Sequence, residues 1–395
     1  MTQTANSERR PRVALYSHDA QGLGHIRRNL AIAHALRGGG RDLDQLLLTS
    51  APDVAHAGRP DGCDIVSLPA LAKDPAGRYG ARHLSVGADQ LVAMRSAVLH
   101  ATLAAFAPDV LIVDKHPRGF RGELEPALAA VRAGGGRVVL GLRDVLDDAT
   151  TAAREWKDAR AAKALRAWYD EVWVYGDPRV HDPIADLDVP RRVRVRHTGY
   201  LAHGRPAARI RTRVGAGPYA LAMVGAGEDG SDLARAFATA AMPAGHRGVV
   251  VAGPHMSADA VADLRRIAAA RDDLQVVRSA PDAAGLIAGA AALVGMGGYN
   301  TVCEALAAAT PMLVVPRIEP RREQLLRAEA LARHDAVDVL MPDDLAPGRV
   351  GDWLASAVSR RERTGAPIDL AGLSRIPDLL ADLVGADTLE TRHVA

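Results

Sequence analysis

The stretch from Val294 to Leu306 (VGMGGYNTVCEAL) predicts a short apolar strand joined to a helix by a glycine turn. Glycines let a backbone approach a ligand closely, and the free N–H groups that begin a helix attract anions. The turn therefore indicates a phosphate cradle, and its candidate residues are Gly297, Gly298, Asn300 and Thr301. Glu304 lies one turn inside the helix, where its carboxylate can accept hydrogen bonds from a pair of hydroxyls.

The next element extends this set of polar contacts. Residues 311–316 (PMLVVP) predict a buried strand, and Glu323 and Gln324 lie where the following helix opens. Phosphate, diol and polar sugar contacts within one strand–turn–helix unit indicate a nucleotide-sugar site. The alternative interpretation of Glu304 is a solvated helix glutamate. The arginines at 317, 321 and 322 could help to neutralise a leaving diphosphate, but surface arginines are the default interpretation.

Two motifs resemble those of a known family. The segment 295–324 (GMGGYNTVCEALAAATPMLVVPRIEPRREQ) resembles the donor-binding segment of GT-B glycosyltransferases, in particular the MurG-like branch (family 28) with its peptidoglycan and plant galactolipid transferases. The run 16–25 (YSHDAQGLGH) resembles their first glycine loop. The two matches lie in opposite halves in the expected order, so the resemblance covers most of the chain. It implies a GT-B fold, with two Rossmann-like, doubly wound α/β domains facing each other across a cleft.

The resemblance also implies roles for the donor-side residues. Glu304 matches the position that binds the ribose, and Glu323 with Gln324 matches the pair that contacts hydroxyls of the donor sugar. Many members have Asp-Gln here, so a glutamate could shift the choice of sugar. Plant small-molecule transferases carry a phosphate-binding histidine in the glycine turn, and this turn has none. Backbone N–H groups and the Thr301 hydroxyl must then hold the phosphates.

Glycosyl transfer needs a base, because the acceptor hydroxyl loses its proton as it attacks the anomeric carbon. A histidine suits this role, and in several GT-B enzymes it lies on the first glycine loop, here Gly22, Gly24 and His25. His25 is therefore the predicted base, and Asp114, which ends the apolar run 109–114, is predicted to orient it. Alternatively, His25 binds water or substrate and Asp114 caps a turn or binds the acceptor. Rival bases on the same loops are His18, Asp19 and His116.

A formal G-x-G-x-x-G pattern follows the strand predicted at 219–224. Nicotinamide-binding domains place an acidic residue at the end of the next strand, but that strand ends here in VVAGPH (250–255), without a carboxylate. NAD binding is therefore disfavoured. Gly225 and Gly227 instead match the glycine loop of the second GT-B domain, and the alternative is a tight strand–helix turn without a ligand.

Composition limits the class of protein. Among the 395 residues, the net charge of +2 and the aromatic content of 4% argue against binding to nucleic acid. Cys63 and Cys303 are too few for a disulfide framework, which favours a reducing compartment. The N-terminus lacks the apolar core of a signal peptide, and glycines and polar residues interrupt the uncharged run 286–303. The sequence predicts a soluble, cytoplasmic protein without a transmembrane segment.

Neither a cofactor nor a metal is expected. Two D-x-D pairs, at 42–44 and 186–188, match the pattern of metal-dependent transferases. Neither pair ends a hydrophobic strand as that role requires, so both are interpreted as solvated loops. A P-loop pattern does not occur in the sequence, which disfavours that kind of phosphate chemistry.

Strands alternate with helices along the chain, a pattern typical of parallel α/β sheets. Residues 1–204 are predicted to form an acceptor-binding domain, 205–218 a linker with Pro and Gly, and 219–395 a domain that binds the nucleotide sugar. The segment 71–88, rich in Gly, Arg and His, predicts a mobile loop. The resemblance implies that the last helix, near 370–384, crosses back onto the first domain.

The predicted function is metal-independent, inverting transfer of a sugar from a nucleoside diphosphate, UDP in the simplest case, to a hydroxyl or amine. The acceptor would be a small molecule or a sugar. The alternatives are a sugar-nucleotide hydrolase on the same fold, a non-catalytic nucleotide-sugar-binding partner and, more distantly, an epimerase. A weak homo-oligomer is compatible with the sequence, which leaves the acceptor, the sugar and the nucleobase open.

Overall fold

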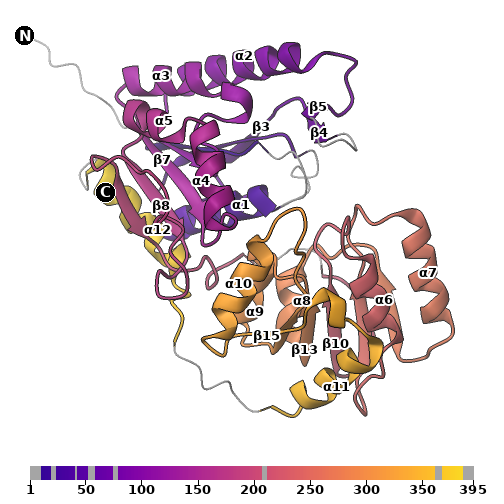
Figure 1. Cartoon of the computed structure of the whole chain (residues 1–395). Coiled ribbons are helices and arrows are strands. Elements are labelled where there is room, and N and C mark those ends of the chain that lie inside the picture. Colours follow the sequence, from indigo (N-terminus) through magenta and orange to yellow (C-terminus); the bar gives the residue numbers. More distant parts are fainter. Residues whose placement is uncertain are drawn as a thin grey trace, which may run out of the picture.

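The computed structural model describes residues 10–18, 24–40, 42–51, 58–73, 79–206, 211–360 and 367–385, which form two α/β domains (Figure 1). The described strands of the first domain make a 7-stranded parallel sheet in the order β3 (Cys63–Ser67), β2 (Asp44–Thr49), β1 (Arg12–Tyr16), β6 (Val110–Asp114), β7 (Arg137–Arg143), β8 (Glu171–Tyr175) and β9 (Arg194–His197). Those of the second make a 6-stranded parallel sheet in the order β12 (Leu274–Val277), β11 (Arg247–Val251), β10 (Tyr219–Met223), β13 (Ala292–Gly295), β14 (Met312–Val314) and β15 (Asp338–Val339).

Helices follow most of the strands and cover both sheets. The first domain contains α1 (Gly24–Gly38), α2 (Ala88–Phe106), α3 (Glu125–Ala133), α4 (Ala149–Asp158), α5 (Ala161–Trp168) and a short 3₁₀ helix, η2 (Phe120–Gly122). The second contains α6 (Ser231–Thr239), α7 (Ala258–Ala269), α8 (Ala283–Gly289), α9 (Tyr299–Ala307), α10 (Glu323–Ala332), η3 (Pro342–Asp344) and α11 (Pro347–Ala357). The chain ends its described part with α12 (Gly372–Val384).

The central strands consist of apolar runs because helices bury both faces of a parallel sheet. All five residues of β6 and all five of β10 are buried, whereas the edge strands β3 and β9 are only partly buried. In each sheet the chain order changes direction between two central strands, β1 with β6 and β10 with β13. Ligands of such sheets bind in the crevice beyond the carboxyl ends at this change of direction, which is where the predicted site residues follow their strands.

The last helix belongs spatially to the first domain. α12 packs against α1, and Figure 1 shows it in yellow beside β8. The chain leaves the first domain and returns to it at one place, because Leu201 pairs with Ala371 in an isolated β-bridge and the Tyr200 N–H donates to the Asp369 carbonyl at 2.8 Å. The outgoing and returning segments therefore form two adjacent crossings between the domains.

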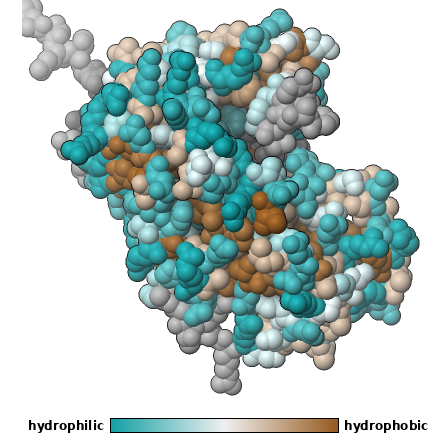
Figure 2. All heavy atoms as spheres, viewed as in Figure 1, coloured by the Kyte–Doolittle hydropathy of each residue, from teal (hydrophilic) through white to brown (hydrophobic). Residues whose placement is uncertain are grey.

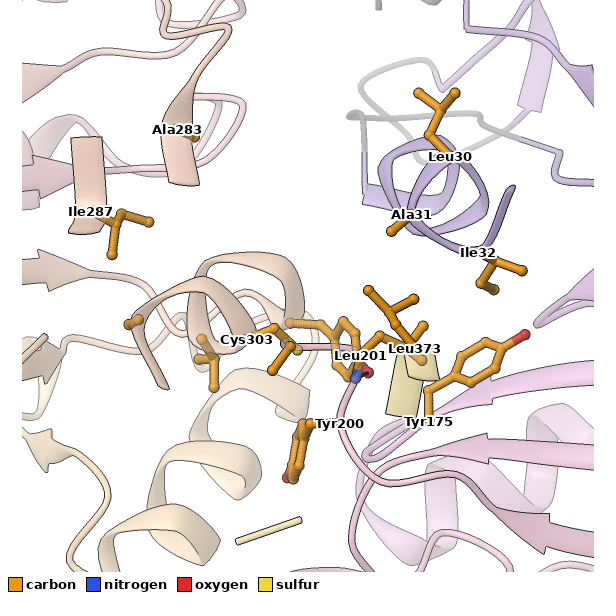
Figure 3. Close-up of a cluster of buried hydrophobic side chains, with 14 of the residues drawn as sticks. Leu30, Ala31, Ile32, Tyr175, Tyr200, Leu201, Ala283, Ile287, Cys303 and Leu373 are labelled. Atoms are coloured by element: carbon orange, nitrogen blue, oxygen red, sulfur yellow. Dashed lines mark hydrogen bonds between the residues drawn. The ribbon is translucent and has the colours of Figure 1, made fainter. Parts of the chain in front are cut away.

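The two domains share a continuous hydrophobic cluster at their junction. Figure 3 shows Tyr200 and Leu201 from the outgoing segment and Leu373 from α12 close to Cys303 from α9. On the face seen in Figure 2, several hydrophobic residues gather between the two domains, while most of the remaining surface is hydrophilic. Packing of these apolar side chains at the junction holds the two domains next to each other.

One local expectation was wrong. The segment predicted as a mobile loop contains an antiparallel hairpin of β4 (Leu71–Lys73) and β5 (Tyr79–Ala81), and residues 74–78 lie outside the described part. Leu71 is fully buried, and the ring of Tyr79 lies 5.1 Å from that of Phe120. Contacts with residues distant in sequence therefore order a segment whose composition resembles a loop.

In the described chain, no helix is long and apolar enough to cross a membrane.

Candidate active site

A histidine–aspartate pair lies at the change of strand order in the first sheet. His25 is the second residue of α1, just after the glycine loop that follows β1, and Asp114 is the last residue of β6. Because β1 and β6 are neighbours, the two side chains meet, and His25 Nδ1 lies 2.9 Å from Asp114 Oδ2. An ionised carboxylate can only accept, so a hydrogen bond between the two places the proton on Nδ1 and leaves Nε2 able to take another proton. Arg28 Nη2 also lies 3.1 Å from Nδ1, but a protonated Nδ1 cannot accept, so in this tautomer the second contact is not a hydrogen bond.

The same carboxylate also binds an arginine. Arg28, one turn along α1, donates to Asp114 Oδ1 at 2.7 Å, and both side chains are almost fully buried. Burial alone would raise the pKa of Asp114, but the charge of Arg28, with that of His25, outweighs it and holds the pKa well below its ordinary value. Asp114 therefore stays ionised at neutral pH and keeps its orientation toward His25.

The rival bases are less suited to proton transfer. His18 and His116 lie next to each other, with ring centroids 4.2 Å apart. Burial lowers the pKa of both imidazoles well below the ordinary value. The next largest cause is the charge of His25 for His18, and the charge of His18 for His116. Both rings are therefore weak bases, and Nδ1 of His18 is buried without a hydrogen-bond partner. Asp19 and Gly22, also proposed for this loop, lie outside the described residues.

The glycine turn of the second domain ends in an uncapped helix. Gly298 precedes α9, and in the described part of the chain no side chain caps the first N–H groups of this helix, so these donors can bind an anion. Gly297 has φ of 80°, and a Cβ there would lie 2.7 Å from Val314 Cγ1, so the turn requires glycine. Thr301 lies in the first turn of α9, as a phosphate contact from its hydroxyl would require.

The second glycine loop lies beside this turn because β10 and β13 are neighbouring strands. Gly225 and Gly227 follow β10, with φ of 64° and 97°. A Cβ on Gly227 would lie 2.4 Å from the Ala252 carbonyl oxygen, so the close approach of two loops demands glycine there. Both glycine loops of the second domain therefore face the same crevice, at the carboxyl edge of its sheet.

Asn300 joins the two glycine motifs across the domain junction. Its Nδ2 donates to the Gly24 carbonyl at 3.0 Å, and its Oδ1 accepts from Arg205 Nη2 at 3.1 Å. The N-terminus of α9 and the start of α1, which come from opposite domains, are thus in direct contact. A group held by the first turn of α9 would lie close to His25, the second residue of α1.

Glu304 is buried, and among the described residues only one of its two carboxylate oxygens has hydrogen-bond partners. Its Oε1 accepts from Arg27 of α1 and lies 3.4 Å from Arg205 Nη1, whereas Oε2 is buried without a partner in the described structure. The unpaired carboxylate oxygen can still accept a hydroxyl, as a ribose diol would need. Full use of both oxygens by a diol requires Arg27 to release the carboxylate.

Glu323 and Gln324 are held by the loop before α10. The Arg317 N–H donates to Gln324 Oε1 at 2.9 Å, and Arg317 Nη2 donates to Glu323 Oε1 at 2.7 Å. The other glutamate oxygen, Oε2, is buried without a partner. A sugar hydroxyl is the kind of donor that this free acceptor could take, and its position next to β14 puts it at the same crevice.

Three arginines of this region were missed by sequence reasoning. Arg28 carried a usable signal, because it lies three residues after His25 and so on the same helix face. Arg27 and Arg205 carried none, since only the contact between domains brings them to Glu304. No group of three or more His, Cys, Asp or Glu residues in the described ranges is arranged to hold a metal, and metal independence stays a prediction.

No protein-family model and no curated protein matches the sequence. Solved structures do match: the glycotransferase of kitacinnamycin has a TM-score of 0.60 at 19% identity, over 97% of this chain and 100% of that chain. UDP-glucose: anthocyanidin 3-O-glucosyltransferase in complex with UDP has a TM-score of 0.60 at 11% identity, over 97% and 98%. Glycosyltransferase VinC in complex with dTDP has 0.56 at 17%, over 94% and 96%. At these identities the similarity establishes the fold, and the prediction of a GT-B architecture is confirmed.

Proposed function

We propose that the protein is a glycosyltransferase that moves a sugar from a nucleoside diphosphate to an acceptor hydroxyl or amine. The observation that carries this proposal is the position of the His25–Asp114 pair. It lies at the carboxyl edge of the first sheet, where Gly24 contacts Asn300 at the free N-terminus of α9. A base from one domain and an anion site from the other thus adjoin the same junction, as transfer between two substrates requires.

In this mechanism the acceptor binds to the first domain and His25 Nε2 removes its proton. Asp114 fixes the Nδ1–H tautomer and stabilises the imidazolium that forms, so it acts as a positioning residue. The attacking oxygen displaces the diphosphate in one step, which inverts the anomeric carbon. The developing negative charge on the leaving group is stabilised by the N–H groups that begin α9, without a metal ion.

The donor is inferred to be a nucleotide sugar, with UDP as the simplest nucleotide. The free oxygens of Glu304 and Glu323 would accept ribose and sugar hydroxyls, respectively. Among the matching structures, one contains UDP and another dTDP, which supports a diphosphate of this size but leaves the base open. Placement in the MurG-like branch, family 28, rests on the resemblance of the sequence motifs at 16–25 and 295–324. A cytoplasmic location and a weak homo-oligomer remain predictions.

Nucleotide binding gives the first test. UDP or dTDP is expected to raise the melting temperature in a thermal-shift assay, because a ligand that binds only the folded state stabilises it by mass action. At 100 times the dissociation constant, this stabilisation is about 2.7 kcal/mol. NAD is expected to have no effect, since no carboxylate follows β11 to hold its ribose. Stabilisation by NAD and by neither pyrimidine nucleotide would overturn the donor assignment.

Glu304→Ala is expected to weaken UDP binding by about 10- to 100-fold, the value of a lost charge-assisted hydrogen bond. Arg27→Ala removes the ion pair with Glu304 but leaves the carboxylate in place, so it should keep or increase UDP affinity. Titration of UDP into both variants by calorimetry distinguishes a Glu304 that binds the nucleotide from a Glu304 that only pairs with the arginines. If Glu304 serves only to pair with the arginines, both variants will lose affinity equally.

Product analysis with the best-binding sugar nucleotide separates transfer from hydrolysis. A transferase forms the glycoside when a library of phenolic, amine and sugar acceptors is added, and releases little free sugar without them. Free sugar at the same rate with and without acceptors would identify the hydrolase alternative. Tight binding without either product would identify a binding protein.

A further inference from the structure

Two cations at the carboxyl edge of the first sheet lack a carboxylate partner. Lys115 is the first residue after β6, and Arg143 is the last residue of the neighbouring strand β7. Within the described residues, neither side chain forms an ion pair or a hydrogen bond, and Arg143 Nε is buried without a partner. Unpaired charge that is partly removed from water is costly, so its presence needs an explanation.

Three neighbouring cations, in contrast, are paired with carboxylates: Arg28 with Asp114 at 2.7 Å, Arg327 with Asp144 at 2.7 Å, and Arg321 with Asp147 at 3.2 Å and with Glu155 at 2.8 Å. The neighbouring carboxylates therefore already form ion pairs with these other arginines. The exception is Glu323, whose Oε1 binds Arg317 and whose Oε2 is free but bonds to neither cation. Lys115 and Arg143 are thus two cations that no carboxylate of the described residues contacts in an ion pair, although Glu323 interacts with both at longer range; they are here called the Lys115–Arg143 pair.

Local electrostatics agree with this description. Burial, reinforced by the positive charge of Arg143, lowers the pKa of Lys115 to about 8. Burial, together with Arg327 and Arg28, lowers the pKa of Arg143 to about 10. Each cation is therefore destabilised by its surroundings, and an anion between them would relieve both.

The backbone at Lys115 is also unusual. Its φ is 67°, in the left-handed region that side chains with a Cβ rarely adopt, and its N–H donates to the Gly141 carbonyl of β7 at 2.8 Å. Such a conformation costs on the order of 1–3 kcal/mol and is concentrated at functional sites. The turn places Lys115 directly after Asp114, at the edge of the sheet that faces the second domain.

Residues of the second domain border the same space. Glu323, at the start of α10, interacts electrostatically with both members of the Lys115–Arg143 pair, and Arg321 precedes that helix. Glu323 is the residue inferred above to contact the donor sugar, and Asp114, which precedes Lys115 in the chain, contacts the inferred base His25. The pair therefore lies where the sugar and the acceptor would meet.

We propose that Lys115 and Arg143 form an anion-binding subsite that receives a carboxylate or phosphate carried by one of the two reactants. This inference rests on the proposed glycosyl transfer and narrows its substrate class. The anion comes either from the donor, as in a uronic acid, or from an acidic acceptor. In both cases it replaces the missing carboxylate and anchors the reactant beside the base.

Matched charged and neutral probes distinguish the two sources. The donor probes are UDP-glucuronate and UDP-glucose, titrated by calorimetry. The acceptor probes are 4-hydroxybenzoate and its methyl ester, titrated into the protein saturated with UDP. One charged probe is expected to bind about 10- to 100-fold more tightly than its neutral counterpart, as charge-assisted hydrogen bonds imply. The preferred pair of probes identifies which reactant carries the anion.

The variants Lys115→Met and Arg143→Met are each expected to remove this preference while retaining UDP binding. The inference is overturned if UDP binds but neither charged probe is preferred, or if the preference survives in both variants. If UDP does not bind, the proposed function fails, and sodium sulfate becomes the probe. Thermal stabilisation by sulfate that both variants lose still supports the subsite, whereas equal stabilisation of all three proteins rejects it.

Stability without a ligand provides an independent readout. Lys115→Met and Arg143→Met each remove an uncompensated charge, so both are expected to unfold at a higher temperature than the wild type. Arg321→Met is the matched control, because it removes a nearby charge that is paired with Asp147 and Glu155, and it should lower the melting temperature. A lower melting temperature for both Met variants of the pair would assign them a structural role instead.

Discussion

Turnover of the His25→Ala variant is expected to fall by about 10²–10⁴-fold, the usual effect of removing a general base. Donor affinity should stay close to the wild-type value, because the inferred nucleotide contacts come from the second domain. His25 is also the one member of the histidine group 18, 25 and 116 that contacts a carboxylate. The measurement is turnover at saturating donor, with donor affinity obtained separately by calorimetry.

Asp114→Asn provides the companion to this variant. It should slow the reaction by altering the tautomer of His25, and the double variant should be little slower than His25→Ala, because nothing remains to be oriented. Asp114 also pairs with buried Arg28, so the stability of the variant is measured first and rates are compared for folded protein only. Near-normal turnover of His25→Ala would transfer the role of base to another residue of these loops, and multiplicative losses would give Asp114 a separate function.

A loss of stability of about 3–5 kcal/mol is expected for Arg327→Met, because it leaves Asp144 buried without its partner. The two side chains are fully buried and form a bidentate ion pair between α10 of the second domain and the end of β7 in the first. Arg327 also donates to the Gly297 carbonyl at 3.1 Å, so it supports the phosphate turn. Denaturation by urea, followed by circular dichroism, should show an earlier midpoint.

The control for this prediction replaces both partners. Asp144→Leu with Arg327→Met removes the unpaired charge and should recover a large part of the loss, since buried pairs are often exchangeable for apolar residues. Recovery should be incomplete because the bond to Gly297 is not restored. A single Arg327→Met variant as stable as the wild type would show that water compensates Asp144 and that the pair does not join the domains.

Much of the fold follows from local sequence because the central strands are short apolar runs bounded by glycines and polar residues. The positions of His25 and Asp114 could be inferred for the same reason, since each follows a strand and parallel strands share a carboxyl edge. β15, with two residues, is too short for any periodicity to reveal. The pairing of strands 71–73 and 79–81 was not predicted because it depends on contacts such as those of Tyr79 with Phe120 and on the burial of Leu71, and not on local composition.

The candidate site was only half predictable. Sequence motifs indicated which groups could bind a ligand, because glycine turns and helix starts have local signatures. They did not indicate which of these groups form hydrogen bonds or ion pairs within the protein when no ligand is bound. The contacts of Glu304 with Arg27 and Arg205 arise from the apposition of segments far apart in sequence, and among the described residues the buried Nε of Arg143 has no partner. Only long-range packing determines them.

The return of α12 to the first domain has a consequence for synthesis. A nascent chain emerges from its N-terminus, and domains generally fold in that order. The surface of α1 that α12 covers is completed by residues 372–384, which leave the ribosome after the whole second domain. The first domain must therefore wait, with apolar side chains uncovered, until the second domain and residues 372–384 have been synthesised. Transplanting it into a chimaera would likewise require two separate pieces of gene, one from each side of the segment that encodes the second domain.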